Sequence, residues 1–228
     1  LGAKALVALA LLKNGVKRNS PIIEDAAQTI KRELGELDPK EISFLEIYSP
    51  GLAVIFLLSM DPNKYEPEIQ CLLDYLQLQQ KPHGGWGYPQ RAKGDTSMTQ
   101  YAVLSTWEAI QAGFHVPSES IDNVTLWLMR TQDPSGAYGY QGVVAPLGAL
   151  VFQSETRLSM GAAGMGSAYI CGDLLELVDT VVTRDEDLPP ALKKIEEKKP
   201  DGSVKKPRTK INGGRLRETL ARGNKWMQ

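Results

Sequence analysis

The sequence contains few of the residues from which disulfide frameworks and zinc sites are built. Its 228 residues include two cysteines and two histidines. A small fold held by disulfides needs many more cysteines, so we expect Cys71 and Cys171, which lie in apolar helical patterns, to be buried free thiols. Neither cysteine has a histidine at helical spacing, because His83 and His115 fall in loops between predicted helices. We therefore predict no metal site and no cofactor.

The chain also lacks an excess of charge of one sign and a long apolar run. Its formal net charge of −1 gives no global attraction to nucleic acid. The apolar run at 1–12 is interrupted by Lys4 and is shorter than the roughly 20 apolar residues of a membrane-spanning helix. The same run has neither an initiator methionine nor the basic leader of a signal peptide. We expect no nucleic-acid partner and no transmembrane segment.

Both ends of the sequence fall inside segments with a helical pattern, at 1–14 and 215–228. We therefore expect the chain to be part of a longer protein, so a targeting signal would lie outside this sequence. Hydrophobic residues make up 42% of the chain and charged residues 23%, which is typical of a globular protein with a buried core.

Apolar residues recur mainly with the 3.6-residue period of an α-helix, and no convincing alternating strand pattern is present. Ser97 and Gln100 have the spacing of a capping box, and either Asp95 or Ser97 could cap the helix that begins there. The sequence predicts an all-α fold with helices at 1–14, 21–34, 49–60, 65–80, 97–112, 118–132, 159–178 and 215–228.

The predicted helices alternate in character, which favours two layers. Some begin with serine and carry small or aromatic residues, whereas the following ones carry a leucine-rich stripe and end in glutamine. We expect the first kind to form an inner layer and the second an outer layer. Glycines near the start of the helix at 159–178 each cost roughly 1 kcal/mol relative to alanine. Close approach of a neighbouring helix would compensate for that cost.

The composition changes sharply between 184 and 210, where Lys, Arg, Asp, Glu and Pro dominate. Such a charged connection is typical of a solvated, flexible insertion, and a basic docking patch for an acidic partner is the alternative. We therefore divide the chain into helical repeats at 1–183, a charged insertion at 184–212 and the start of a further helix at 213–228.

Two stretches of the chain repeat each other at an offset of 52 residues. Gln80, Gly84, Trp86 and Tyr88 correspond in this way to Gln132, Gly136, Tyr138 and Tyr140. A period of this length indicates an array of helical units that bury their apolar faces against their neighbours. The glutamine can bond backbone groups left open at the end of a neighbouring helix, and the aromatic ring can shield those bonds. We interpret Gln80, Trp86, Gln132 and Tyr138 as a structural clamp between repeats.

These residues resemble the glutamine–tryptophan repeat of squalene–hopene cyclases and, more broadly, the prenyltransferase and squalene oxidase repeat. The stretch 94–104 looks like the start of that family's inner helix, and Ser159-Met160 repeats Ser97-Met98 at an offset of 62. Cyclases, protein prenyltransferases and bacterial proteins without an assigned activity share the repeat, and we favour a bacterial member. The resemblance covers about residues 1–180 and implies an α/α toroid, of which this chain would form an arc.

The catalytic motifs of that family are missing from this sequence. A squalene-type cyclase protonates an alkene with an Asp-any-Asp-Asp motif, whereas the stretch here is Gly94-Asp95-Thr96-Ser97. Tyr101, Trp107 and Tyr169 of the predicted inner helices are too few to stabilise carbocations along a cavity. The Cys–Gln thioester motif of complement-type toroids is also absent.

Three further patterns carry weak signals. The glycines at 161–167 lack the preceding strand and the spacing of a dinucleotide-binding loop. Ser167 lacks the flanking glycines of a hydrolase nucleophile. Asp173 lies in an apolar helix, where it is a candidate buried carboxylate, pairs with a neighbouring residue or faces the rim.

The sequence therefore predicts a binding protein rather than an enzyme. We expect an apolar or isoprenoid-like ligand, or a protein partner, at the central cavity or the rim of the toroid. One alternative is a fragment of a terpene cyclase whose acid motif lies outside the chain, and another is a protein-interaction scaffold. Catalytic residues are not assigned, and the candidate ligand-binding residues are Tyr88, Asp95, Tyr101, Tyr140, Gln153 and Glu155.

Overall fold

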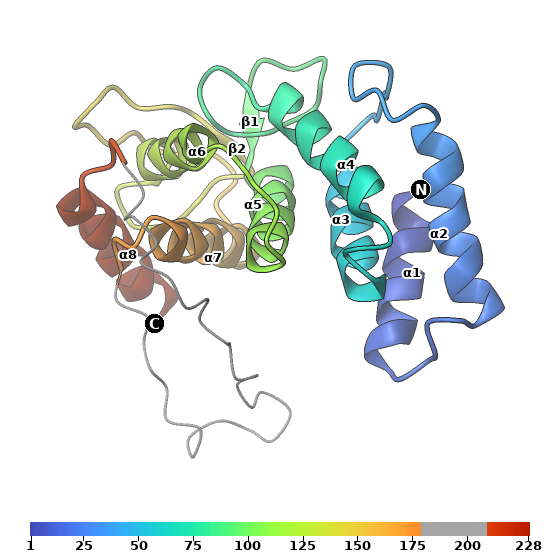
Figure 1. Ribbon diagram of the computed structural model, residues 1–228. Coiled ribbons are helices and arrows are strands. Elements are labelled where there is room, and N and C mark those ends of the chain that lie inside the picture. The colour runs from blue at the N-terminus through green and yellow to red at the C-terminus, as the bar shows by residue number, and fades with distance from the viewer. Residues whose placement is uncertain (179–208) are drawn as a thin grey trace.

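A computed structural model describes residues 1–178 and 209–228 of the chain (Figure 1). The described part is mainly helical, which confirms the predicted all-α class. Two strands of two residues each, β1 (Gly94–Asp95) and β2 (Gln141–Gly142), pair antiparallel. The helices are α1 (Gly2–Lys13), α2 (Pro21–Leu34), α3 (Tyr48–Met60), α4 (Glu66–Gln79), α5 (Thr96–Gln111), α6 (Ser118–Arg130), α7 (Leu158–Leu174) and α8 (Gly213–Met227).

The observed helices begin and end close to the predicted positions. Two features differ from the prediction: the end of α7 and the presence of two short strands. α7 ends at Leu174, four residues before its predicted end, and Glu176 beyond it has a positive φ of 52°. The strands β1 and β2 were not predicted, because an alternating pattern cannot be recognised over two residues. The strands pair Gly94 with Gly142 and Asp95 with Gln141, so they join the loops that precede α5 and α7.

The helices form two layers, as the alternation of their sequences predicts. Within one layer α1 contacts α3, α3 contacts α5 and α5 contacts α7. The even-numbered helices cover this row, with α2 against α1, α4 against α3, and both α6 and α8 against α7. In Figure 1, α1 and α7 lie toward opposite ends of the row.

The core lies between the layers, and α3 is its most buried helix. Nine of the 13 residues of α3 are buried. A helix that is apolar on all sides needs neighbours on all sides. For α3 these neighbours are α1, α4 and α5. Gly51 allows the backbones of α3 and α5 to approach, because a Cβ atom there would lie 3.2 Å from the carbonyl oxygen of Tyr101.

The glycines of α7 have different surroundings. A side chain at Gly161 would collide with the ring of Trp226 on α8, as the predicted close approach of a helix requires. At Gly164 the neighbour is the ring of Tyr138, which belongs to the repeated loop. The prediction is wrong for Gly166, where a Cβ atom would meet no other atom within 4 Å.

Most of the charged insertion predicted at 184–212 lies outside the described residues. Its last residues, 209–212, are described and are anchored to α6. The hydroxyl of Thr209 and the backbone N–H of Lys210 both donate to the carboxylate of Asp122, at 2.5 and 3.0 Å. Asp122 is buried, and a buried carboxylate needs hydrogen-bond donors. Thr209 and Lys210 supply them, so this part of the predicted insertion packs against the outer layer.

Candidate functional site

The two repeated glutamines make equivalent bonds. The Gln80 amide nitrogen donates to the carbonyl oxygen of Gly84 at 2.8 Å and to that of Ser120 on α6 at 3.0 Å. The Gln132 amide nitrogen donates to the carbonyl oxygen of Gly136 at 3.1 Å and to that of Thr219 on α8 at 2.9 Å. Each glutamine thus joins its own loop to the next outer helix, as a clamp between repeats requires.

The glycines of the two loops explain the close fit of these clamps. Gly84 and Gly136 have φ values of +100° and +101°, a conformation that favours glycine. A Cβ atom at Gly84 would collide with the backbone of Asn123 on α6, and one at Gly136 with the backbone of Arg222 on α8. The contact residues Asn123 and Arg222 each lie three positions beyond the carbonyl that the glutamine bonds.

The aromatic partners of the clamps are both buried but differ in their bonds. The indole nitrogen of Trp86 donates to the carbonyl oxygen of Leu76 on α4 at 2.7 Å. The hydroxyl of Tyr138 has no hydrogen-bond partner among the described residues, and burial raises its pKa. Tyr138 therefore supports its repeat through packing of its ring, against which Gly164 lies.

A chain of hydrogen bonds connects the first turns of α3 and α5. The hydroxyl of Tyr48 lies 2.6 Å from the Ser97 hydroxyl, which in turn donates to Oδ1 of Asp95 at 2.6 Å. Since the Ser97 proton is directed to the carboxylate, the Ser97 oxygen accepts the Tyr48 proton. Burial raises the pKa of Tyr48, and the nearby Tyr140 hydroxyl and Asp95 carboxylate act in the same direction.

Asp95 is the helix cap, one of the two possibilities that the sequence leaves open. Its Oδ1 accepts the backbone N–H groups of Ser97 and Met98 at 3.1 and 3.2 Å. The predicted capping box of Ser97 and Gln100 is wrong, because Ser97 lies inside the first turn. The side chain is 1% exposed, and its Oδ2 atom has no partner among the described residues. A buried carboxylate oxygen without a donor calls for an explanation.

A cleft of about 340 Å³ lies beside this bonded chain, and two predicted residues line it. Tyr140 and Glu155 form its walls together with Arg91, Gln141 and Ser154. The Arg91 guanidinium lies 5.0 Å from the ring centre of Tyr88, which brings a third predicted residue to the same place. Gln141 is the strand partner of Asp95, so β1 and β2 connect the cleft to the cap of α5.

The other two predicted residues have different positions. Tyr101 lies on α5 six residues after the cap Asp95, and its ring meets that of Tyr48 edge to face with centres 5.1 Å apart. Gln153 is buried, and its side chain bonds the backbone of Val143 and Val151 at 2.8–3.1 Å. We correct its assignment from ligand binding to the support of the loop before α7.

Sequence reasoning missed Tyr48 and Arg91. Tyr48 is the first residue of α3 and Asp95 caps α5, so both stand at the start of a helix of the same layer. The position of Tyr48 at the start of a predicted helix of the same layer as Asp95 is the sequence signal that could have identified it as a candidate site residue. Arg91 lies in the loop after the first repeat, where the sequence gives no sign of its stacking on Tyr88.

The remaining candidates have structural roles. Cys71 and Cys171 are buried free thiols, as predicted, and burial raises their pKa values to about 11 and about 12. Asp173 is exposed, so it is not a buried carboxylate. Within residues 1–178 and 209–228, no group of three potential metal ligands is present, and no helix is long and apolar enough to cross a membrane.

Comparison of the chain with models of protein families, with curated proteins and with solved structures finds no match.

Proposed function

We propose that residues 1–178 form an arc of an α/α toroid and that its rim, at the starts of α3 and α5, binds a small ligand. The support for the toroid is the equivalence of the two glutamine clamps and the row formed by α1, α3, α5 and α7. A curved row of this kind places the starts of its helices around one opening. The resemblance to the prenyltransferase and squalene oxidase repeat agrees with this architecture.

The observation that carries the binding proposal is the chain of polar groups from Tyr48 through Ser97 to the buried Asp95. Tyr48, Tyr101 and Tyr140 are only partly buried, so each leaves part of its surface open to a ligand. These groups suit a ligand with a hydroxyl head, because the head can donate to the oxygen of Tyr48, whose own proton is donated to Ser97.

The ring surfaces of the same tyrosines suit an apolar body attached to that head. Aromatic side chains combine a large apolar surface with a polar tip, and such residues fix the orientation of amphipathic ligands. We therefore assign the ligand to the isoprenoid-like class, in the form of an isoprenoid alcohol. No catalytic step is assigned, since the groups bonded to Asp95 are hydroxyls and backbone N–H groups rather than a second carboxylate.

The test is calorimetric titration of the full chain with farnesol, compared with squalene, which has no hydroxyl head. We expect farnesol to bind, and we expect Tyr140→Phe and Asp95→Asn each to weaken that binding about threefold to tenfold. Asparagine caps helices as well as aspartate does, so Asp95→Asn removes the charge and keeps the fold. Tyr169→Phe on α7, whose hydroxyl bonds Asn224, is the matched control and should bind like the parent.

Equal farnesol affinity in all four proteins would refute the rim site. Conversion of squalene or a prenyl diphosphate to a cyclic product by a longer protein that contains this chain, retained in Asp95→Asn, would replace the binding proposal by the cyclase alternative.

A further inference from the structure

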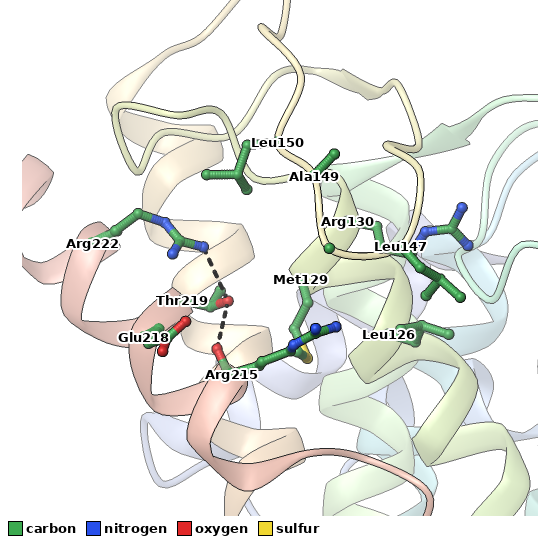
Figure 2. A pocket seen from close by; sticks show the side chains of 11 residues that line it. Leu126, Met129, Arg130, Leu147, Ala149, Leu150, Arg215, Glu218, Thr219 and Arg222 are labelled. Carbon is green, nitrogen blue, oxygen red and sulfur yellow. Dashed lines mark hydrogen bonds between the residues drawn. The ribbon is translucent and has the colours of Figure 1, made fainter.

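We infer that a second site, on the outer layer, binds an amphiphile with a phosphate or carboxylate head and a short apolar body. The site is a pocket of about 310 Å³ between α6, α8 and the loop 147–150 (Figure 2). It is separate from the rim, because its walls come from the even-numbered helices, whereas the rim is built from the starts of α3 and α5. Its volume is at the lower end of the range of about 300–1,000 Å³ that small-molecule sites have.

The charge of the lining favours an anion. Arg130 of α6 and Arg215 and Arg222 of α8 line the pocket, and Glu218 is its single acidic residue. None of the ion pairs within residues 1–178 and 209–228 involves these arginines. Guanidinium groups bind phosphate and carboxylate through paired N–H donors, so a lining with three of them selects a head of that kind.

The three arginines differ in how much of their bonding capacity is already used. Arg130 donates from Nε to the carbonyl oxygen of Ala145 at 2.6 Å, and Arg222 donates from Nε to the Gln132 amide oxygen at 3.1 Å. The Arg215 guanidinium has no hydrogen bond within the described residues, and Figure 2 shows it extending from α8 toward Met129 of α6. Arg215 is therefore the group most available to a ligand.

The remaining walls are apolar and suit the body of the ligand. Leu126 and Met129 of α6 lie opposite α8, and Leu147 and Leu150 come from the loop above them. Leu147 is 72% exposed and Leu150 is 38% exposed, so the loop presents apolar surface that the described residues leave uncovered. A ligand chain of a few carbons would cover part of this surface, which is favourable by about 0.8 kcal/mol for each buried methylene group.

Arg222 connects this pocket to the repeat clamp. Its Nε bonds the oxygen of the Gln132 amide, whose nitrogen bonds Thr219 on the same helix. An anion bound beside Arg222 would hold that side chain in place and stabilise the junction of α8 with the second repeat. Occupation of the pocket should therefore raise the thermal stability of the protein.

The experiment is calorimetric titration of the full chain with octyl phosphate below its micelle concentration, with ethyl phosphate and octanol as the two partial ligands. We expect octyl phosphate to bind more tightly than either. Arg215→Gln should weaken its binding about threefold to tenfold, a range that allows for the exposure of this arginine. Arg32→Gln on α2, which removes the same charge far from the pocket, is the matched control and should bind like the parent.

A second variant tests the apolar wall. Leu150→Ser should reduce the advantage of octyl over ethyl phosphate and leave ethyl phosphate binding unchanged. Equal binding by the Arg215→Gln and Arg32→Gln proteins would overturn the proposal, and so would octanol that binds as tightly as octyl phosphate. Ethyl phosphate that binds as tightly as octyl phosphate would overturn the amphiphile class.

Sedimentation with vesicles of phosphatidylcholine and phosphatidic acid distinguishes a lipid head group from a free amphiphile. The segment 184–210 carries nine lysines and arginines and also attracts anionic vesicles, so the measured quantity is the difference between the Arg215→Gln and Arg32→Gln proteins. A loss confined to Arg215→Gln assigns the head group of a lipid to the pocket. If the Arg215→Gln and Arg32→Gln proteins sediment equally but still differ in their affinity for octyl phosphate, the pocket binds a free amphiphile.

Discussion

Corresponding positions of the two repeats share their main bonds but differ in burial and in their additional partners. Gln132 is fully buried and its side chain bonds four residues, including the sulfur of Met165 at 4.0 Å, whereas Gln80 is partly exposed and bonds two. Trp86 bonds a helix carbonyl through its indole nitrogen, whereas Tyr138 contributes only its ring. Substitutions at corresponding positions are therefore not equivalent, even though the sequence repeats.

His83 shows how a loop residue can make the stability of the fold depend on pH. Its Nδ1 accepts the backbone N–H of Gly85 at 3.1 Å, and its Nε2 lies 3.1 Å from the carbonyl oxygen of Ala92. These bonds fix the neutral ring with its proton on Nε2. The ring also stacks on Trp127, with centres 6.0 Å apart. Burial lowers the pKa of His83 below its usual 6.5, and the charges of Lys81 and Arg130 lower it further.

We predict that the contribution of His83 to stability declines as the pH falls below about 6.5. In that range His83 is protonated in the unfolded chain but stays neutral in the folded protein. The free energy of unfolding therefore decreases as the pH falls, by less than about 1.4 kcal/mol per pH unit. His83→Asn keeps an acceptor for Gly85 and cannot titrate. Urea unfolding between pH 5 and 8 should give a shallower slope for this variant, and identical slopes would contradict the prediction.

The helices are joined through side chains that bond backbone groups of the next outer helix. The Gln80 and Gln132 amides do this for α6 and α8, and Asp122 does it for the segment that leads into α8. The helix ranges were predictable because a period of 3.6 residues is a local property. The end of α7 was not predictable, since the apolar residues after Leu174 continue the pattern while the backbone turns at Glu176.

We predict that the two clamps differ in the free energy that they contribute. Gln132→Leu removes a buried amide that bonds the carbonyl oxygens of Gly136 and Thr219, and it leaves the Nε of Arg222 without its partner, which should cost about 2–4 kcal/mol. Gln80→Leu should cost about 1–2 kcal/mol, because water can reach part of that site. Gln79→Leu, at a neighbouring partly exposed position on α4, is the matched control.

Urea unfolding of the parent and the three variants measures these differences. Losses at Gln80 and Gln132 no larger than that of Gln79→Leu would show that the amides do not act as clamps.

In the described part of the molecule α1, α3, α5 and α7 contact one another in a row, and the even-numbered helices pack against α1, α3 and α7. Within residues 1–178 and 209–228, α3 and α5 have helices of their own layer on both sides, whereas α1 has α3 on one side only. In such arrays stability depends on the interfaces between adjacent units, and the outermost units have one interface fewer.

We predict that amide hydrogen exchange is slowest in α3 and α5 and fastest in α1 and α2 among the helices. The central helices open only with the global unfolding of the chain, whereas the outer pair can open by itself. Peptide-resolved exchange monitored by mass spectrometry measures the order. Equal protection of α1 and α3 would show that the chain unfolds as one unit without separable repeats.

The sequence by itself determined the helices, the all-α class, the repeat and the residues of the clamp, because these depend on periodicity and on spacing along the chain. Tertiary structure alone decided which side chains share a site. Tyr48 and Ser97 are 49 positions apart, and Arg130 and Arg215 are 85 apart, so no local pattern could place them together. It also decided that Gln153 supports a loop, since a side chain is committed to a structural bond only when folding brings a backbone group within its reach.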